Sequence, residues 1–250
     1  GNWELNGYGD PENVNTGFGW RGHFNEQPPA VPTKDNHVGS YRKVIDIPAD
    51  WNGKQVIAHF GSVTSNIYLY VNGKFAGYAE DSKVAAEFDI TPYLKKGKNL
   101  IAFQTFRWCD GSWCEDQDFW RLSGVARENY LYARNKNIHL DDIRVVGDLD
   151  NQYRDGILRL KPNFSVDKSK KVNNNLEIEY SLYDADGKKL DCVPRREASG
   201  DIAMLVGNPH KWTAETPYLY TLMVKVKLLD KVIEEVPIKV GFRKVEIKNK

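Results

Sequence analysis

Short runs in which apolar and polar residues alternate make up most of the first half of the chain. The runs that predict strands cover residues 41–47, 55–60, 67–71, 74–78, 88–90, 99–108 and 125–132. A period of two places the apolar side chains on one face of a sheet, and no comparable helical period interrupts these runs. We therefore expect a β-sandwich of jelly-roll type.

Two local signals refine this expectation. Asn72-Gly73 lies between two alternating runs and predicts a type I′ hairpin, because both central residues of that turn need a positive φ. Residues 91–97 predict a single helical turn. In that turn we expect Thr91 to be the N-cap, Pro92 to take the first helical position and Gly97 to mark the exit.

A second group of strands is predicted after a polar seam at residues 133–137. Its clearest runs are 138–146, 156–160, 176–183, 219–228 and 236–242. Roughly seven short strands over about 110 residues are typical of an immunoglobulin-like sandwich. The Cys…Trp…Cys pattern of true immunoglobulin domains is absent from the sequence, so only the architecture is implied.

The two ends of the chain differ from the strand-rich middle. Glycine, proline and asparagine are frequent in residues 1–40, which predicts irregular chain, while the aromatic residues among them indicate packing. The sequence starts at Gly1 without an initiator methionine, and residues 243–250 contain no natural stop. We expect this chain to be a segment of a longer protein.

The composition argues against several classes of function. With 35 Lys+Arg and 34 Asp+Glu, the net charge of +1 offers no electrostatic surface for nucleic acid or an anionic membrane. Cys109, Cys114 and Cys192 have no Cys-x-x-Cys spacing, and the five histidines are scattered, so neither a disulfide framework nor a zinc site is predicted. Nucleophile-elbow, phosphate-loop and dinucleotide-binding motifs are missing from the sequence.

Residues 108–121 combine four carboxylates with four large aromatic side chains. Carboxylates are not buried alone, so these must be paired, solvated or directed at a ligand or cation. Acids beside aromatic rings suit a sugar, whose hydroxyls donate to the acids while its C–H face stacks on a ring. An acidic surface loop anchored by its aromatics is the alternative. The sequence does not show a catalytic pair of acids within the loop.

The loop also carries a family resemblance. Residues 110–124, DGSWCEDQDFWRLSG, closely resemble the DGS-x-x-EDQD-[MF]-WR-x-SG signature of β-galactosidases of glycoside hydrolase family 2. Segments 2–15, 28–41, 208–220 and 240–245 resemble further family motifs in the same order. The resemblance extends over nearly the whole chain.

The resemblance implies a domain order. Residues 1–134 are expected to form a galactose-binding-like jelly roll that lacks the family's first strands, and residues 135–243 an immunoglobulin-like sandwich. Residues 244–250 would begin a linker to a (β/α)8 barrel that holds two catalytic glutamates. A barrel needs about 250 residues of its own, so it is absent from this chain and no catalytic residue is assigned here. The missing first strands predict an unpaired sheet edge.

Two substrate-binding residues are implied by position in the motifs. Asn15 matches a family asparagine that helps to bind galactose, although Glu12-Asn13 departs from the family pattern beside it. Asp118 matches an aspartate that hydrogen-bonds the sugar and ligates sodium. The other sodium ligands would lie in the barrel, so we expect no stable sodium site in this chain. Sodium and magnesium are implied for the parent enzyme only.

The resulting hypothesis is that the chain is the non-catalytic part of a retaining β-galactosidase that acts on terminal β-D-galactosides. Its partners would be galactosides and the absent barrel, with no nucleic acid or membrane, in a homo-oligomeric parent. A free-standing carbohydrate-binding module is the alternative. In a third interpretation the loop only packs against the barrel. The cellular compartment stays open.

Overall fold

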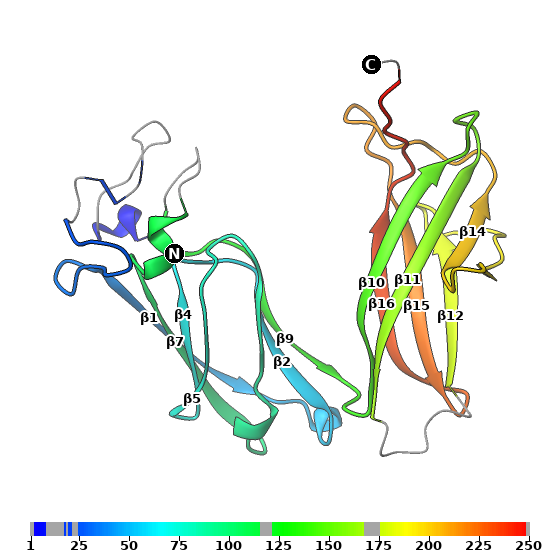
Figure 1. Ribbon diagram of the computed structural model, residues 1–250. Helices are drawn as coiled ribbons and strands as arrows, with labels where there is room; N and C mark the ends of the chain where they lie inside the picture. Colours follow the sequence, from blue (N-terminus) through cyan, green and yellow to red (C-terminus); the bar gives the residue numbers. More distant parts are fainter. Residues whose placement is uncertain are drawn as a thin grey trace. The chain divides into compact units, whose positions relative to one another are not determined.

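The computed structural model describes residues 3–8, 18, 20–21, 25–115, 122–167 and 176–248. The chain divides into two compact units, Gly1–Ala133 and Arg134–Lys250, which we call the first and second units (Figure 1). Both are built from antiparallel sheets, so the predicted all-β class is confirmed. The helices of the described ranges are single 3-10 turns, and none is long and apolar enough to span a membrane.

The first unit contains two main sheets and a small ribbon. One sheet has the order β1-β7-β4-β5, formed by Val38–Asp46, Lys98–Phe106, Ile67–Val71 and Lys74–Ala79. The other has the order β6-β2-β9, formed by Ala86–Asp89, Gln55–Phe60 and Asn129–Arg134. The ribbon pairs β3, Val63–Thr64, with β8, Gly124–Val125. This arrangement confirms the predicted jelly-roll sandwich.

Alternation along the strands produces the core between these sheets. In β4, Ile67, Leu69 and Val71 are buried, whereas the tyrosines between them are half-buried on the opposite face. Phe60 of β2 and Phe88 of β6 belong to the same apolar cluster. The inward side chains of the two sheets therefore form one hydrophobic core.

The predicted β4–β5 hairpin is present. Asn72 and Gly73 both have positive φ, 51° and 80°, as the turn requires. The Asn72 side chain also binds outside the turn: its Nδ2 donates to Tyr93 O at 2.9 Å, and its Oδ1 accepts from Leu100 N at 3.0 Å. The turn is thus tied to the start of β7.

Two predictions for this unit are wrong in detail. Thr91 lies inside the helical turn η3 (Thr91–Tyr93), and its hydroxyl accepts a hydrogen bond from Val56 N at 2.8 Å instead of capping the turn. Asp89, two residues earlier, accepts from Thr91 N at 3.0 Å. The turn ends at Tyr93 with Leu94 as its C-cap, so the exit predicted at Gly97 is also wrong. The run predicted at 125–132 is two strands, because β8 pairs with β3 and β9 pairs with β2, so the chain changes partner between them.

The second unit is an immunoglobulin-like sandwich, as predicted. One sheet has the order β10-β11-β14-β13, formed by Ile138–Leu149, Gly156–Val166, Ile202–Val206 and Arg195–Arg196. The facing sheet has the order β12-β15-β16, formed by Leu176–Tyr183, Tyr220–Leu228 and Lys231–Val240. Leu158, Leu182, Leu222 and Phe242 are fully buried in its core. β13 and β14 were not predicted.

Candidate functional site

Residues 108–121, which we call the acidic-aromatic loop, follow shortly after the end of β7 at Phe106. The side-chain amide of Asn36 holds the first residue of the loop: Nδ2 donates to Trp108 O at 3.0 Å and Oδ1 accepts from Trp108 N at 2.9 Å. One amide thereby satisfies both backbone groups of Trp108, as a neighbouring strand would. Arg107 N donates to His37 O at 2.8 Å. Residues 36–37, just before β1, therefore lie beside the start of the loop.

A single helical turn, η4 (Asp110–Trp113), continues the loop. The Ser112 hydroxyl accepts a hydrogen bond from Cys109 N at 3.0 Å and closes the turn at its start. After the turn, Glu115 accepts hydrogen bonds from both the backbone N–H and the hydroxyl of Ser82, at 2.8 and 2.5 Å. This carboxylate therefore has a structural role, anchoring the loop to the segment between β5 and β6.

Aromatic contacts join the loop to the N-terminal segment. Trp113 Nε1 donates to Ala30 O at 2.9 Å, and the Trp113 ring lies 4.5 Å from that of Trp20. On the other side of the loop, Ser123 N donates to Glu4 Oε1 at 3.3 Å. A residue within the loop, Trp113, and a residue just after it, Ser123, are thus both held against residues 1–30 of the chain.

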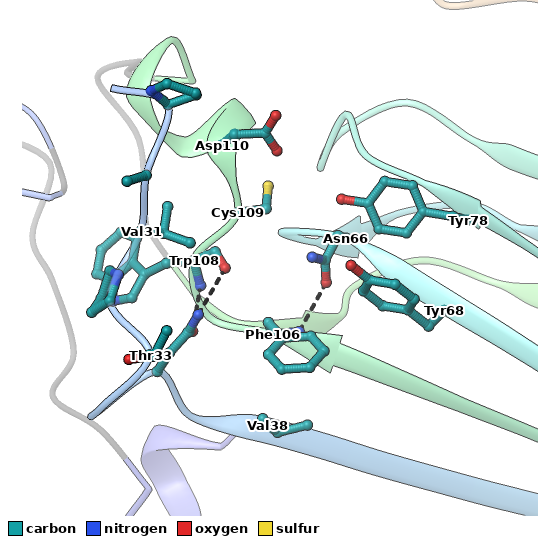
Figure 2. Close-up of a pocket in the computed structure, with 14 residues that line it drawn as sticks. Val31, Thr33, Val38, Asn66, Tyr68, Tyr78, Phe106, Trp108, Cys109 and Asp110 are labelled. Carbon is teal, nitrogen blue, oxygen red and sulfur yellow. Dashed lines mark hydrogen bonds between the residues drawn. The ribbon is translucent and has the colours of Figure 1, made fainter. Parts of the chain in front are cut away.

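A cleft of about 630 Å³ lies beside the start of the loop. Figure 2 shows Tyr68 and Tyr78 on one side of it, Trp108 and Val31 on the other, and Asp110 at one end. The tyrosine rings are 4.5 Å apart at their centroids. Aromatic walls with a few polar groups are typical of small-molecule sites, and these residue types suit a sugar.

The hydroxyl of Tyr78, which lines the cleft, hydrogen-bonds to the Glu80 carboxylate. Burial, together with this carboxylate, raises the pKa of Tyr78 above its ordinary value. The phenol is neutral at pH 7 in any case, and it donates its hydrogen bond to Glu80.

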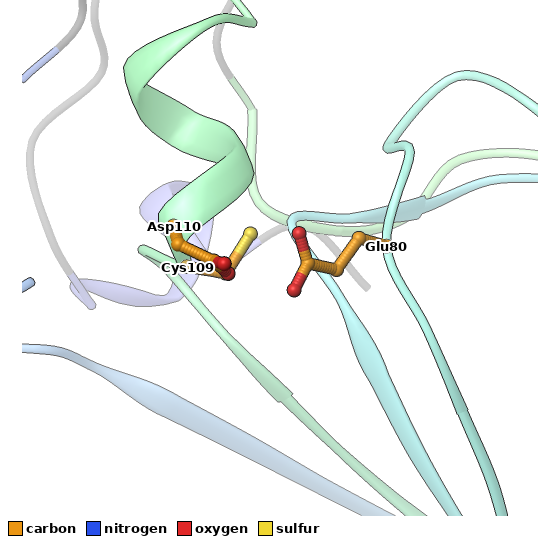
Figure 3. A group of neighbouring side chains, drawn as sticks. All are labelled: Glu80, Cys109 and Asp110. Atoms are coloured by element: carbon orange, nitrogen blue, oxygen red, sulfur yellow. The ribbon is translucent and has the colours of Figure 1, made fainter. Parts of the chain in front are cut away.

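Glu80, Cys109 and Asp110 form a small group whose ligand atoms lie within 4.8 Å of one another (Figure 3). Gly111 allows this approach, since a Cβ there would lie 2.8 Å from Glu80 Oε2. Burial raises the pKa of the Cys109 thiol, which opposes thiolate formation. Sulfur is also a poor ligand for hard cations such as magnesium. The three-residue set does not fit the ions implied for the parent enzyme, and we assign no metal to it.

The sequence-predicted site residues are only partly within the described ranges. Asn15 and Asp118 both lie outside them, so their substrate-binding roles and the sodium ligation by Asp118 stay predictions. Within the described part of the loop, Trp108 and Asp110 line the cleft, while Glu115 is bound to Ser82. Sequence reasoning missed the cleft residues Asn66, Tyr68 and Tyr78. The tyrosines had a usable signal, since they occupy outward positions of two alternating strands.

Family models match both units. A model described as glycosyl hydrolases family 2, sugar binding domain, matches residues 1–135, and a model described as glycosyl hydrolases family 2 matches residues 138–243. The chain belongs to glycosyl hydrolases family 2. The resemblance predicted from the loop motif is thereby confirmed, and the two sandwiches are the sugar-binding and immunoglobulin-like domains of that family.

The chain is also similar to individual glycosidases. The chain is 41% identical to a β-galactosidase of Halalkalibacterium halodurans and 40% identical to one of Streptococcus thermophilus, in each case over 100% of this chain and 24% of the relative. A solved β-glycosidase from Bacteroides vulgatus superposes with a TM-score of 0.69 at 25% identity, over 84% of this chain and 26% of that one. The chain thus spans about a quarter of the length of the curated relatives it matches.

Proposed function

We propose that this chain is the non-catalytic N-terminal part of a β-galactosidase that hydrolyses terminal β-D-galactosides with retention of configuration. The relatives that match it over its full length are named β-galactosidases, and each is about four times longer. In this proposal the chemistry belongs to a separate (β/α)8 domain that carries two carboxylates about 5–5.5 Å apart. Domain boundaries at 1–134 and 135–243, with a linker from 244, are part of the same proposal.

The role proposed for the first unit is to extend Asn15 and Asp118 into the sugar pocket of the barrel. Two contacts support this role. They join residues that come before and after Asn15 to residues that come before and after Asp118. Glu4 and Trp20 lie on either side of Asn15, whereas Ser123 and Trp113 lie on either side of Asp118. Glu4 contacts Ser123 and Trp20 contacts Trp113, so the two segments are anchored to each other at both ends.

In this proposal the ligands of the sodium ion also come from both this chain and the barrel. Asp118 would supply one sodium ligand from this chain, and the barrel would supply the remainder. Magnesium and the homo-oligomeric state are proposed for the parent enzyme alone. Galactoside binding by the complete enzyme is the partner interaction to which the first unit contributes.

Hydrolysis assays test the proposal directly. The longer protein should hydrolyse a nitrophenyl β-D-galactoside and release β-galactose first, as followed by NMR of the anomeric proton. Residues 1–250 should give no turnover above buffer, because the catalytic carboxylates lie elsewhere. Turnover by the 250-residue chain, or first release of α-galactose, contradicts the proposal.

A free-standing carbohydrate-binding module is the second candidate, favoured by the cleft between Tyr68, Tyr78 and Trp108. Calorimetric titration of the chain with galactose and lactose separates the two candidates. A dissociation constant below about 1 mM that is lost on Tyr78→Ala would support the module. The leading proposal expects no measurable binding, because the barrel half of its pocket is missing.

A further inference from the structure

Glu4, in the first helical turn η1 (Glu4–Asn6), contacts residues on both sides of the acidic-aromatic loop. Its Oε1 atom lies 3.8 Å from Arg107 Nη1 and accepts a hydrogen bond from Ser123 N at 3.3 Å. Arg107 immediately precedes the loop, and Ser123 lies two residues beyond it. One carboxylate oxygen therefore joins the two ends of the loop that contains Asp118.

The two ends of the loop belong to different parts of the sandwich. Arg107 follows β7 and Ser123 precedes β8, and these two strands lie in different sheets of the described structure. A loop whose ends are held at a fixed separation has fewer conformations than one whose ends move independently. The contacts of Glu4 thus restrict the arrangement of the loop directly.

The ion pair between Glu4 and Arg107 is buried, with side-chain exposures of 3% and 6%. Removing two charges from water is costly, so replacing a buried ion pair by apolar side chains of similar volume is often neutral for stability. Such a pair still selects one arrangement of its partners, because a buried ion is unfavourable without an opposite charge beside it. The burial of this pair therefore favours a role in positioning over a role in stability.

Neighbouring contacts fix both partners of the pair. Trp3, directly before η1, is buried, and its Nε1 donates to Tyr41 Oη at 2.6 Å. A Cβ at Gly39 of β1 would lie 2.1 Å from the Trp3 ring, so the glycine leaves room for that ring. The guanidinium of Arg107 lies 5.2 Å from the centre of the Trp108 ring. A displacement of η1 or of the guanidinium would break these contacts.

We propose that Glu4 is a positioning residue for the galactoside site. By joining Arg107 to Ser123, its carboxylate sets the position at which the loop presents Asp118 to the sugar. This inference rests on the role proposed above for Asp118. Glu4 acts through the loop and not by contact with the substrate, so its removal displaces a binding group without deleting one.

Hydrogen exchange of the 250-residue chain tests whether Glu4 holds the loop. Glu4→Ala removes the acceptor of Ser123 N–H, and we expect exchange about tenfold faster at Ser123 and across residues 108–113. Glu234→Ala is the matched control, since it removes another carboxylate that accepts from a backbone N–H, that of Leu140 in the second unit. The control should leave exchange in the loop unchanged. Native exchange at Ser123 in Glu4→Ala overturns the proposal.

Kinetics of the longer protein test whether the loop acts through Asp118. Glu4→Ala should lower kcat/KM for a β-D-galactoside about tenfold. In a protein that already carries Asp118→Ala, adding Glu4→Ala should cause no further loss, because the group that Glu4 positions is gone. A loss of stability alone would not depend on Asp118 in this way, and Glu234→Ala should keep the native kcat/KM.

The outcomes separate the positioning role from the role of Asp118. Native kcat/KM for Glu4→Ala beside a loss for Asp118→Ala rejects the positioning role alone, as does an equal loss on Glu4→Ala with and without Asp118. Native kcat/KM for Asp118→Ala rejects the role proposed for Asp118, and the positioning role with it.

Glu4→Gln keeps the test decisive should Glu4→Ala not fold. The glutamine preserves the side-chain volume and an oxygen acceptor for Ser123 N–H, and it removes the charge that faces Arg107. We expect kcat/KM to fall only about threefold, and not to fall at all in the Asp118→Ala protein. A loss that persists in that protein contradicts the proposal.

Discussion

At the scale of single residues, the carboxylates of the acidic-aromatic loop have different roles. Glu115 accepts two hydrogen bonds from Ser82, a buried residue. Asp110 is exposed at the end of the cleft and stays available to a ligand. A cluster that looks uniform in sequence is therefore divided between holding the loop and facing the solvent.

Removal of the Glu115 carboxylate should destabilise the first unit. Glu115→Ala leaves the buried N–H of Ser82 without its acceptor and leaves its hydroxyl only the longer contact with Ser65 O at 3.5 Å. We expect a loss of about 2 kcal/mol in the free energy of unfolding. Urea denaturation measures it. A double-mutant cycle with Ser82→Ala should give a coupling energy of roughly 1 kcal/mol. Additive losses would show that the two side chains do not interact.

A second residue-scale prediction concerns Glu234, which accepts a hydrogen bond from Leu140 N at 2.8 Å. Burial raises the pKa of Glu234. The hydrogen bond from Leu140 N and the attraction of His139 and Arg134 offset this rise only in part, and repulsion from Asp141 adds to it. Because the folded state binds this proton more tightly than the unfolded state, the stabilisation is complete below the ordinary pKa of glutamate. It is lost as the pH rises through the raised pKa.

Glu234→Gln keeps an acceptor for Leu140 N–H and removes the buried charge. The variant should therefore gain stability relative to the native chain as the pH rises from about 4 to 7, as followed by urea unfolding at several pH values. Glu235→Gln is the matched control, because Glu235 is exposed and pairs with Lys225 at 2.7 Å. A stability difference for Glu234→Gln that does not change with pH contradicts this account.

At the scale of elements, the β4–β5 hairpin shows which features local sequence can specify. Asn72-Gly73 correctly predicts the turn, since both residues adopt the positive φ it needs. The contacts of Asn72 with Tyr93, Asn99 and Leu100 were not predictable, because they join residues far apart in the sequence. The split of residues 125–132 was missed for a related reason: a change of pairing partner leaves the alternation intact.

Two substitutions in the β4–β5 turn measure separately the cost of backbone strain and the contribution of side-chain hydrogen bonds to stability. Gly73→Ala should cost about 1 kcal/mol through its positive φ alone, since a Cβ there would meet no atom within 4 Å. Asn72→Gly keeps the turn but loses the hydrogen bonds of the side chain, so we expect a cost of about 2 kcal/mol. Thermal unfolding measures both. A smaller loss for Asn72→Gly than for Gly73→Ala would mean that these hydrogen bonds add little.

At the scale of the whole molecule, the architecture and the family could both be predicted from the sequence. Alternation predicted both sandwiches, but β3 and β13 have only two residues each and carry no period to detect. Of the candidate site, the loop could be predicted from its motif. The cleft could not, because Asn36, Tyr68 and Trp108 meet only after both hairpin and loop have folded.

We propose that the first unit contributes a sugar-binding carboxylate to a catalytic domain outside residues 1–250. The most direct test is kcat/KM for a β-D-galactoside in the longer protein carrying Asp118→Ala, with Asp186→Ala on an exposed turn as the control. Loss of a charged hydrogen bond to the substrate should lower kcat/KM by about a hundredfold, while the control stays at the native value. A kcat/KM for Asp118→Ala within about twofold of native would contradict the account.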